Sequence, residues 1–209
     1  MFLEKISNEV LNGDLNDIES TVVEALKRHR PEEIINDGLI KGMRIVGEKF
    51  KNGEYFLPEV MVSAETMHKA LELLRPKLEN SDYTSKCSVV FGTVRGDLHD
   101  IGKNLVAMMF IGAGFDVIDL GIDVTPDKFA EAISEHKPRL LCLSALLTTT
   151  MPEMGVVISA LEEKQLRNRV KVMIGGAPVT QKYADKIGAD GYASNAAEAV
   201  DKANSLFNF

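Results

Sequence analysis

The residues best suited to chemistry lie in one short stretch, VVFGTVRGDLHDIG, at positions 89–102. Its apolar start predicts a β-strand, and Gly92 and Gly96 predict the loop that follows. Asp97 and His99 lie in that loop, with His99 at its exposed tip. Such an imidazole can ligate a metal through one nitrogen while the carboxylate accepts a hydrogen bond from the other, which fixes the tautomer. The same pattern, taken alone, is also typical of a helix N-cap beside a solvent-facing imidazole.

Two further predicted strands end in small or polar residues. One apolar run ends at Ser144 and Leu146, and a second ends at Gly175 and Gly176. Open α/β sheets bind their ligands at the carboxyl ends of the strands, so three loops are expected to converge on one site. Each feature has a simpler interpretation by itself, because Gly-Gly is typical of a strand-to-helix turn and Ser144 of a hydroxyl satisfied within the fold.

Together these residues resemble the cobalamin-binding signature of methionine synthase, methylmalonyl-coenzyme A mutase and the corrinoid proteins of methanogens and acetogens. The three elements, DxHxxG, SxL and GG, occur in the family's order and at its spacing. The resemblance implies a cobalamin or other corrinoid cofactor, with His99 as the lower ligand of cobalt in place of the cofactor's own base. The cofactor-binding residues that it implies here are Gly96, Asp97, His99, Asp100, Gly102, Ser144, Leu146, Thr148, Thr150, Gly175 and Gly176.

The resemblance also implies a proton relay behind the histidine. Asp97 is expected to accept the hydrogen bond of His99, and Thr150 stands where methionine synthase has Ser, so the hydroxyl is kept. Proton movement through Asp97 would couple the basicity of the ligand to the oxidation state of cobalt, between cob(I)alamin and methylcob(III)alamin. Thr148 is expected to contact the edge of the corrin ring.

In this family the nucleotide tail of the cofactor is buried in the protein. A buried tail needs close approach to the backbone, which Gly102, Gly175 and Gly176 permit because they lack Cβ. Ser144 is expected to hydrogen-bond the tail, and Leu146 to pack on it.

Periodicity divides the chain into a helical domain at 1–80, a polar linker at 81–86 and an α/β domain at 87–209. The helical domain is predicted to be a four-helix bundle, and the α/β domain a flavodoxin-like or Rossmann-like five-stranded parallel sheet of order 2-1-3-4-5. The bundle's helices are expected to start at about Phe2, Asp14, Pro31 and Pro58, and to end near Gly13, before Pro31, at Asn52-Gly53 and before Pro76. The strands are expected at 87–94, 115–120, 139–145, 170–175 and 190–193, and the intervening helices at about 101–112, 126–136, 151–164, 180–187 and 196–206.

The helical domain resembles the cap that covers the upper corrin face in methionine synthase. Phe50, Leu57 and Val60 fall on the matching positions. Apolar side chains there would exclude water from the methyl–cobalt bond. The alternative is that these residues belong only to the core of the bundle.

The composition limits the partners. A net charge of −7 and a sequence pI of about 5.2 argue against nucleic acid or an anionic membrane. Cys87 and Cys142 lack metal-binding spacing and indicate structural thiols in a reducing compartment. The start of the chain has no signal-peptide pattern and no apolar run is long enough to span a membrane, so a cytoplasmic location is expected.

The cap favours methyl transfer over the adenosylcobalamin mutases, which need a large catalytic barrel. No catalytic residues are expected here, so the chain is predicted to be a carrier that is not catalytic alone. Residues 175–200 are especially similar to the corrinoid proteins of methylamine and quaternary-amine (betaine) systems. The implied partners are a methyltransferase specific for the methyl donor, a second methyltransferase that uses coenzyme M or tetrahydrofolate as acceptor, and a reductive-activation protein.

Three alternatives stay open at this point. The chain could serve a methanol or methoxyarene system, which uses close relatives. It could be a cobalamin-dependent regulator or sensor, although the sequence has no DNA-binding helix-turn-helix and no basic patch. It could also be a binding module without a cofactor, which the spacing of the three motifs disfavours.

Overall fold

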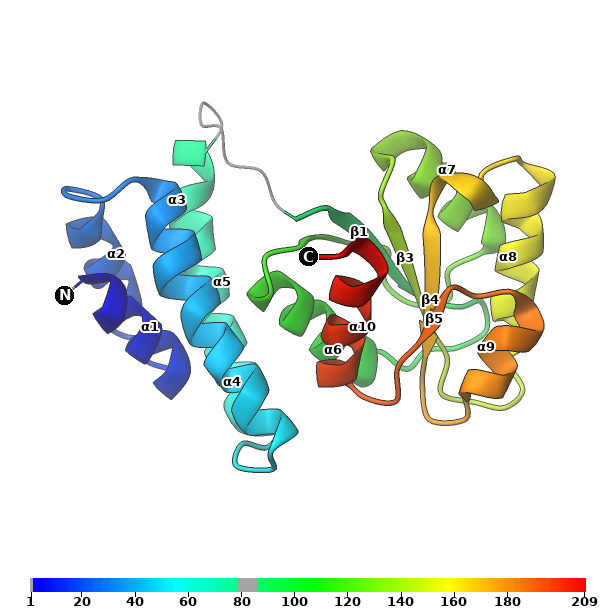
Figure 1. Cartoon of the computed structure of the whole chain (residues 1–209), viewed down its shortest axis with the longest axis horizontal. Helices are drawn as coiled ribbons and strands as arrows, with labels where there is room; N and C mark the ends of the chain where they lie inside the picture. Colours follow the sequence, from blue (N-terminus) through cyan, green and yellow to red (C-terminus); the bar gives the residue numbers. More distant parts are fainter. Residues whose placement is uncertain (1, 79–85) are drawn as a thin grey trace. The chain divides into compact units, whose positions relative to one another are not determined.

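The computed structural model describes residues 2–78 and 86–209 (Figure 1). The described residues form two compact units, one helical and one α/β, with residues 111–114 grouped with the helical unit. The predicted linker at 81–86 lies, apart from Lys86, outside the described residues. No helix in the described part of the chain is long and apolar enough to cross a membrane.

The helical unit is a bundle, as predicted. Its elements are α1 (Phe2–Asn12), α2 (Ile18–Ala25), α3 (Pro31–Glu33), the π-helical stretch η1 (Ile34–Ile40), α4 (Lys41–Lys51) and α5 (Leu57–Leu78). Since α3, η1 and α4 follow one another without a break, the unit consists of four helical rods. Its core contains Ile6, Val10, Ile18, Val22, Ile34, Leu39, Met43, Val46, Val60, Met67 and Leu74.

The third rod differs from the prediction of one regular helix, because η1 interrupts it. The interruption coincides with close packing against α1. A Cβ at Gly38 would lie 2.9 Å from Ile6 Cγ2, and one at Gly42 would lie 2.6 Å from the carbonyl oxygen of Ser7. Both glycines therefore allow the rod to approach α1 more closely than a side chain would.

Two predicted helix boundaries were also wrong. The second helix begins at Ile18 rather than Asp14, because Asp14 Oδ1 accepts hydrogen bonds from the backbone N–H groups of Asn16 and Asp17, both at 3.3 Å, and so forms a turn. The fourth helix passes through Pro76 and ends at Leu78. Proline is tolerated there because it lies in the last turn, where it removes one hydrogen bond from a helix of 22 residues.

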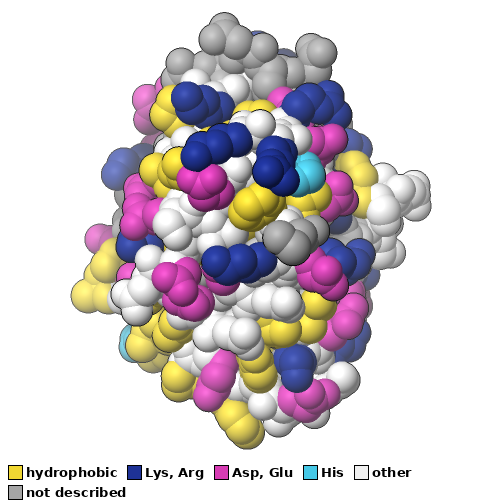
Figure 2. All heavy atoms as spheres, turned by 90° about the vertical axis from the view of Figure 1, so that its left-hand side faces the viewer, with side chains coloured by type: hydrophobic (Ala, Val, Ile, Leu, Met, Phe, Trp, Pro, Cys, Tyr) yellow, Lys and Arg dark blue, Asp and Glu magenta, His cyan; other side chains and the backbone are white. Residues whose placement is uncertain are grey.

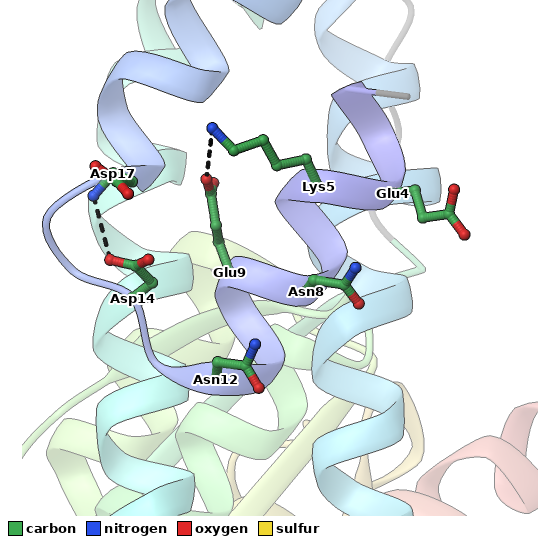
Figure 3. A pocket seen from close by; sticks show the side chains of 7 residues that line it. All are labelled: Glu4, Lys5, Asn8, Glu9, Asn12, Asp14 and Asp17. Atoms are coloured by element: carbon green, nitrogen blue, oxygen red, sulfur yellow. Dashed lines mark hydrogen bonds and ion pairs between the residues drawn. The ribbon is translucent and has the colours of Figure 1, made fainter.

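The surface of the helical unit carries mixed charges. A hollow of about 340 Å³ lies beside α1. The Glu9 carboxylate pairs there with Lys5 at 3.4 Å. Figure 3 shows this pair together with the turn that Asp14 forms with Asp17. In Figure 2, basic and acidic side chains alternate across the face in view, so neither charge dominates that face.

The α/β unit has the predicted strand order, β2-β1-β3-β4-β5, with all strands parallel. The strands are β1 (Ser88–Thr93), β2 (Asp116–Asp119), β3 (Leu140–Ser144), β4 (Lys171–Gly175) and β5 (Gly191–Tyr192). The helices are α6 (Ile101–Gly112), α7 (Pro126–His136), α8 (Glu153–Glu163), α9 (Gln181–Ile187) and α10 (Ala196–Phe207), with a short 3-10 turn η2 (Arg167–Arg169) before β4. Strand and helix limits agree with the prediction to within about two residues.

Helices cover both faces of this sheet (Figure 1). On one face α7, α8 and α9 pack on a core that includes Val90, Leu141 and Val172. On the other, Phe110 of α6 packs edge-on against Phe91 of β1, with ring centroids 5.1 Å apart. Alternate residues of the central strands thus face opposite helical layers, as expected for a sheet that is buried on both sides.

The register brings the three predicted loops together. Thr93 at the end of β1 pairs with Ser144 at the end of β3, and Ser144 pairs with Gly175 at the end of β4. The stretches that begin with Val94, Ala145 and Gly176 therefore leave the same edge of the sheet side by side.

Candidate cobalamin site

The loop between β1 and α6 turns sharply at its start. Val94 forms a bridge with Val124 and donates its backbone N–H to the carbonyl oxygen of Ser144 at 3.0 Å. Asp97 N–H donates back to the carbonyl of Val94 at 3.1 Å. Gly96 has φ = +79°, a value that glycine adopts without strain. The turn directs the Asp97 side chain inward, where it is fully buried.

The buried carboxylate of Asp97 is a hydrogen-bond acceptor on both oxygens. Oδ2 accepts the hydroxyl of Thr150 at 2.6 Å and the backbone N–H groups of Leu146 at 2.8 Å and Leu147 at 3.3 Å. Oδ1 accepts the backbone N–H of His99 at 3.1 Å and lies 2.8 Å from His99 Nδ1. The predicted relay of histidine, carboxylate and hydroxyl is thus assembled in the structure.

These hydrogen bonds determine the charge of Asp97. Burial by itself raises the pKa of the carboxyl group. The hydrogen bonds from the Thr150 hydroxyl, the Leu146 N–H and His99 outweigh burial and hold the pKa of Asp97 well below its usual range. Because an ionised carboxylate only accepts hydrogen bonds, the proton between the two side chains lies on Nδ1 of His99.

His99 is therefore oriented for ligation. Its side chain is 50% exposed, and Asp97 occupies Nδ1. No hydrogen bond joins Nε2 to any other residue in the described parts of the chain, so this nitrogen is available to a ligand. Thr93 supports the loop from beneath, since its buried hydroxyl donates to the carbonyl of His99 at 3.0 Å.

The other predicted residues from the first motif lie at the start of α6. Asp100 Oδ2 accepts a hydrogen bond from Asn104 Nδ2 at 3.2 Å, and the carbonyl of Asp100 accepts the Asn104 N–H at 2.7 Å. In this structure Asp100 thus bonds to the first turn of α6 through its side chain and its carbonyl group. Gly102 faces open space, because no other residue would lie within 4 Å of a Cβ built there.

The two glycines of the third motif have different surroundings. Gly176 has φ = +128°, and a Cβ there would lie 1.9 Å from the carbonyl oxygen of Ala145. The fold itself therefore requires glycine at 176. At Gly175 a Cβ would meet the carbonyl oxygen of Ala193 at 3.4 Å, an ordinary contact. Among the three predicted tail-binding glycines, Gly102 has the most room for a ligand.

The rim of this edge is unusually apolar for a surface. The exposed hydrophobic side chains at the carboxyl ends of the strands are Leu98, Ile101, Ile122, Leu146 and Leu147. Leu98 and Ile101, on either side of His99, are 66% and 70% exposed. Thr148 is also exposed, and Ser144 is half-buried. A large ligand with an apolar face would cover these side chains, which fits the face of a corrin ring.

The predicted cap residues belong to the helical unit. Phe50 and Leu57 are half-buried, whereas Val60 is fully buried in the bundle core and has no surface to offer. Phe56, which the sequence analysis did not single out, is 65% exposed. Contact of Phe50 and Leu57 with the upper corrin face stays a prediction.

The sequence analysis did not predict two structural features beside the site. Asp123 bonds to the backbone on both sides of Asp97, and the buried ammonium of Lys103 pairs with the Asp119 carboxylate at the end of β2. The Lys103–Asp119 ion pair could have been suspected from the sequence, because a lysine stands in the first turn of the strongly apolar helix α6.

The donor set fits cobalt held by a corrin. No group of three or more His, Cys, Asp or Glu residues in the described ranges could hold a metal ion. A corrin supplies four equatorial nitrogens, so the protein needs to provide only one axial ligand, and His99 is available for it.

The fold and the site define a cobalamin-binding domain that follows a helical domain, and family comparison agrees. Residues 87–201 match the B12 binding domain family, and residues 2–75 match a second B12 binding domain family.

Full-length relatives narrow the class. The chain is 45% identical to dimethylamine corrinoid protein 1 of Methanosarcina acetivorans, over 98% of this chain and 96% of that one. It is 46% identical to the trimethylamine corrinoid protein of Methanosarcina barkeri, over 98% of this chain and 89% of that one. The solved methanol:cobalamin methyltransferase complex MtaBC of M. barkeri superposes with a TM-score of 0.91 at 30% identity, over 99% of this chain and 80% of that chain. The chain belongs to the family of corrinoid proteins, and its cofactor is a corrinoid.

Proposed function

We propose that this corrinoid protein is the methyl carrier of a methylamine methyltransferase system. The observation that carries the proposal is the hydrogen-bonded series Thr150–Asp97–His99. It leaves Nε2 of an oriented imidazole free at an apolar edge of the sheet. The similarity to dimethylamine and trimethylamine corrinoid proteins supports an amine as the methyl donor.

Each of these three hydrogen-bonded residues has a separate role. Nε2 of His99 would ligate cobalt from the lower side, and Asp97 would hold the ring orientation and the proton on Nδ1. The Thr150 hydroxyl and the Leu146 N–H keep Asp97 ionised, so the imidazole is a stronger donor than a free histidine. When bound, the corrinoid supplies a cobalt centre that can accept a methyl group and give it up.

The apolar rim would exclude water from the lower face of the ring. Leu98 and Ile101 flank the ligand, and Leu146 and Leu147 lie on the neighbouring loop. Gly102 leaves space for the nucleotide tail beside the first turn of α6. Ser144 and Thr148 would donate hydrogen bonds to the polar periphery of the cofactor.

The proposal requires two enzyme partners and a source of electrons. One methyltransferase would load the carrier from a methylated amine, and a second would transfer the methyl group to coenzyme M or tetrahydrofolate. A reductive-activation protein would supply one electron to return cobalt(II), formed by accidental oxidation, to cobalt(I). No catalytic residue of its own is assigned to this chain.

The test is methylation of the reduced, reconstituted protein, followed by visible absorbance. The protein is loaded with hydroxocobalamin, desalted, reduced to cobalt(I), and mixed with mono-, di- or trimethylamine, or a betaine, and each candidate donor-specific methyltransferase. The proposal expects loss of the cobalt(I) band with one amine pair, and no loss without the enzyme. If the cobalt(I) band persists with every combination of amine and methyltransferase, the amine proposal is overturned.

A methanol system is the second candidate, since the MtaBC complex superposes closely on this chain. Methanol with its methyltransferase therefore forms a parallel arm of the same experiment. Reaction in that arm alone would replace the amine donor with methanol and leave the carrier function in place.

A further inference from the structure

Asp123 holds the backbone on both sides of Asp97. Its Oδ1 accepts the backbone N–H of Gly96 at 2.6 Å, and its own backbone N–H donates to the carbonyl oxygen of Asp97 at 3.1 Å. One residue thus contacts the backbone N–H of the residue before Asp97 and the carbonyl oxygen of Asp97 itself. Asp97 N–H itself donates to the carbonyl of Val94 at 3.1 Å.

Asp123 adopts an uncommon backbone conformation to do so. Its φ is +52°, in the left-handed region, which aspartate and asparagine enter more readily than most residues other than glycine. Because its side chain is exposed, burial does not account for an aspartate in this conformation. The hydrogen bond that its carboxylate accepts from the Gly96 N–H does account for it.

The segment that carries Asp123 is itself fixed to β1. Leu120 N–H donates to the carbonyl of Phe91 at 2.8 Å, and Thr93 N–H donates to the carbonyl of Gly121 at 2.9 Å. Val124 N–H donates to the carbonyl of Thr93 at 2.9 Å. Asp123 is therefore held by backbone hydrogen bonds on both sides of it in sequence.

A buried ion pair anchors the start of the same segment. The ammonium of Lys103, in the first turn of α6, pairs with Asp119 Oδ2 and donates to Asn104 Oδ1 at 2.6 Å. The other oxygen of Asp119 accepts the N–H of Gly121 at 2.9 Å. Segment 119–124 thus connects β2 and α6 to the loop that carries His99.

We propose that Asp123 is a positioning residue for His99, acting through Asp97; this rests on the proposed ligation of cobalt by His99. The carboxylate of Asp97 is fixed from the other side by Thr150 and Leu146. With Asp123 in place, the backbone of Asp97 is fixed as well, so the carboxylate can hold the imidazole in only one direction. Without the Asp123 carboxylate, the peptide group that carries the Gly96 N–H can rotate, so the backbone that enters Asp97 shifts and the imidazole ring loses its fixed orientation.

The test measures ligation rather than methyl transfer. Four variants are loaded with hydroxocobalamin and reduced to cobalt(II): Asp123→Ala, Asp123→Gly, Asp123→Asn, and Asp127→Ala as a control. Asp127 is an exposed aspartate nearby, and its ion pair with Lys164 lies outside the loop. The fraction of cobalt(II) with histidine bound is then followed by electron paramagnetic resonance as the pH is lowered.

Each variant removes a different property. Asp123→Ala removes the acceptor and is disfavoured at positive φ. Asp123→Gly removes the acceptor without strain at positive φ but adds backbone freedom, and Asp123→Asn keeps an oxygen acceptor without the charge. We expect Ala and Gly to lower the ratio of histidine-bound to histidine-free cobalt(II) about tenfold at a given pH, the effect of losing a hydrogen bond in this loop. Asn and the Asp127→Ala control should retain the wild-type ratio.

A second readout needs no cofactor. In the protein without corrinoid, the nitrogen chemical shifts of the His99 ring report the tautomer. They should show one tautomer, protonated on Nδ1, in the wild type and Asp123→Asn, and an average of two in Asp123→Gly.

The outcomes separate the two proposals. Wild-type ratios and a single tautomer in Asp123→Gly would overturn the positioning role while His99 ligation stands. Loss of ligation in Asp123→Asn as severe as in Ala would assign the effect to charge and overturn the hydrogen-bond account. If the wild type itself shows no histidine nitrogen on cobalt(II), the proposed ligation fails instead.

Discussion

Thr150 donates its hydroxyl proton to Oδ2 of Asp97 at 2.6 Å, although 53 positions of sequence separate the two residues. Both are buried, and the acceptor is ionised, so this is a short, charge-assisted hydrogen bond. It ties the loop after β3 to the loop after β1. Thr150 is therefore connected to His99 through the carboxylate of Asp97.

Replacing Thr150 tests that bond. Thr150→Val keeps the shape but removes the donor, and should lower the free energy of unfolding by about 2 kcal/mol, because Asp97 loses a hydrogen bond to a charged group. Thr150→Ser keeps the hydroxyl and should cost under about 1 kcal/mol. Urea unfolding of both variants checks this. Equal stability of the two variants would show that the hydroxyl contributes nothing.

Asp97 makes the stability of the protein depend on pH. Its pKa is lower in the folded chain than the usual value of about 3.9 in the unfolded chain, so its interactions stabilise the fold fully above that value. They are lost as the pH falls from about 4 toward the folded-state pKa. We expect the stability gap between wild type and Asp97→Asn to be constant from about pH 7 to pH 5 and to shrink below about pH 4.

Urea unfolding at several pH values measures that gap. Asp190, another carboxylate with a lowered pKa, supplies the control. The stability difference between the wild type and Asp190→Asn should also shrink at acid pH, but this substitution should leave corrinoid binding unchanged. A gap for Asp97→Asn that does not change between neutral and acid pH would contradict the assignment of the charge to Asp97.

The same substitution should change the redox behaviour of bound cobalt. Asp97→Asn keeps a hydrogen-bond partner for Nδ1 but removes the negative charge, so His99 becomes a weaker donor. We expect the protein to retain its corrinoid while the cobalt(II)/cobalt(I) potential rises. Spectroelectrochemical titration measures it. A potential identical to that of the wild type would show that the charge of Asp97 does not influence the reduction of cobalt.

Two glycines form a matched pair for testing the cofactor space. Gly176→Ala should destabilise the fold by about 3 kcal/mol or more, since its Cβ would clash with the Ala145 carbonyl at a positive φ. Gly102→Ala meets nothing within 4 Å and lies in the first turn of α6, so stability should change by less than about 1 kcal/mol. If the tail occupies that space, corrinoid affinity should nevertheless fall about tenfold, or 1.4 kcal/mol.

Thermal unfolding and equilibrium binding of cyanocobalamin distinguish the pair. Unchanged affinity in a stable Gly102→Ala protein would place the tail elsewhere.

Much of the fold could be predicted because it depends on local patterns. Apolar runs such as 170–174 and the glycines that follow them mark strand ends, and parallel topology then brings those ends to one edge. The Asp97–His99 pair is also local, since two residues of one loop can be paired from spacing alone. The pairing of Thr150 with Asp97 was predicted from the family resemblance.

What escaped prediction depends on contacts between distant segments. Asp123 lies 27 residues from Gly96, and nothing near it in the sequence shows that its side chain accepts the Gly96 N–H. The π-helical stretch η1 follows a regular helical pattern, and its position coincides with the close approach of α1 at Gly38. Val60 has the apolar character expected of both a core residue and a cap residue, so only the structure placed it in the core.

The most direct test of the central claim is the cobalt(II) electron paramagnetic resonance spectrum of wild-type protein grown with histidine that carries the heavy nitrogen isotope. The protein is loaded with hydroxocobalamin of natural isotope content, desalted and reduced by one electron. Ligation by His99 predicts a nitrogen splitting that follows the isotope in the protein and disappears in His99→Ala. A splitting that keeps the pattern of the natural isotope would mean that the cofactor's own base remains bound, and would contradict the assignment.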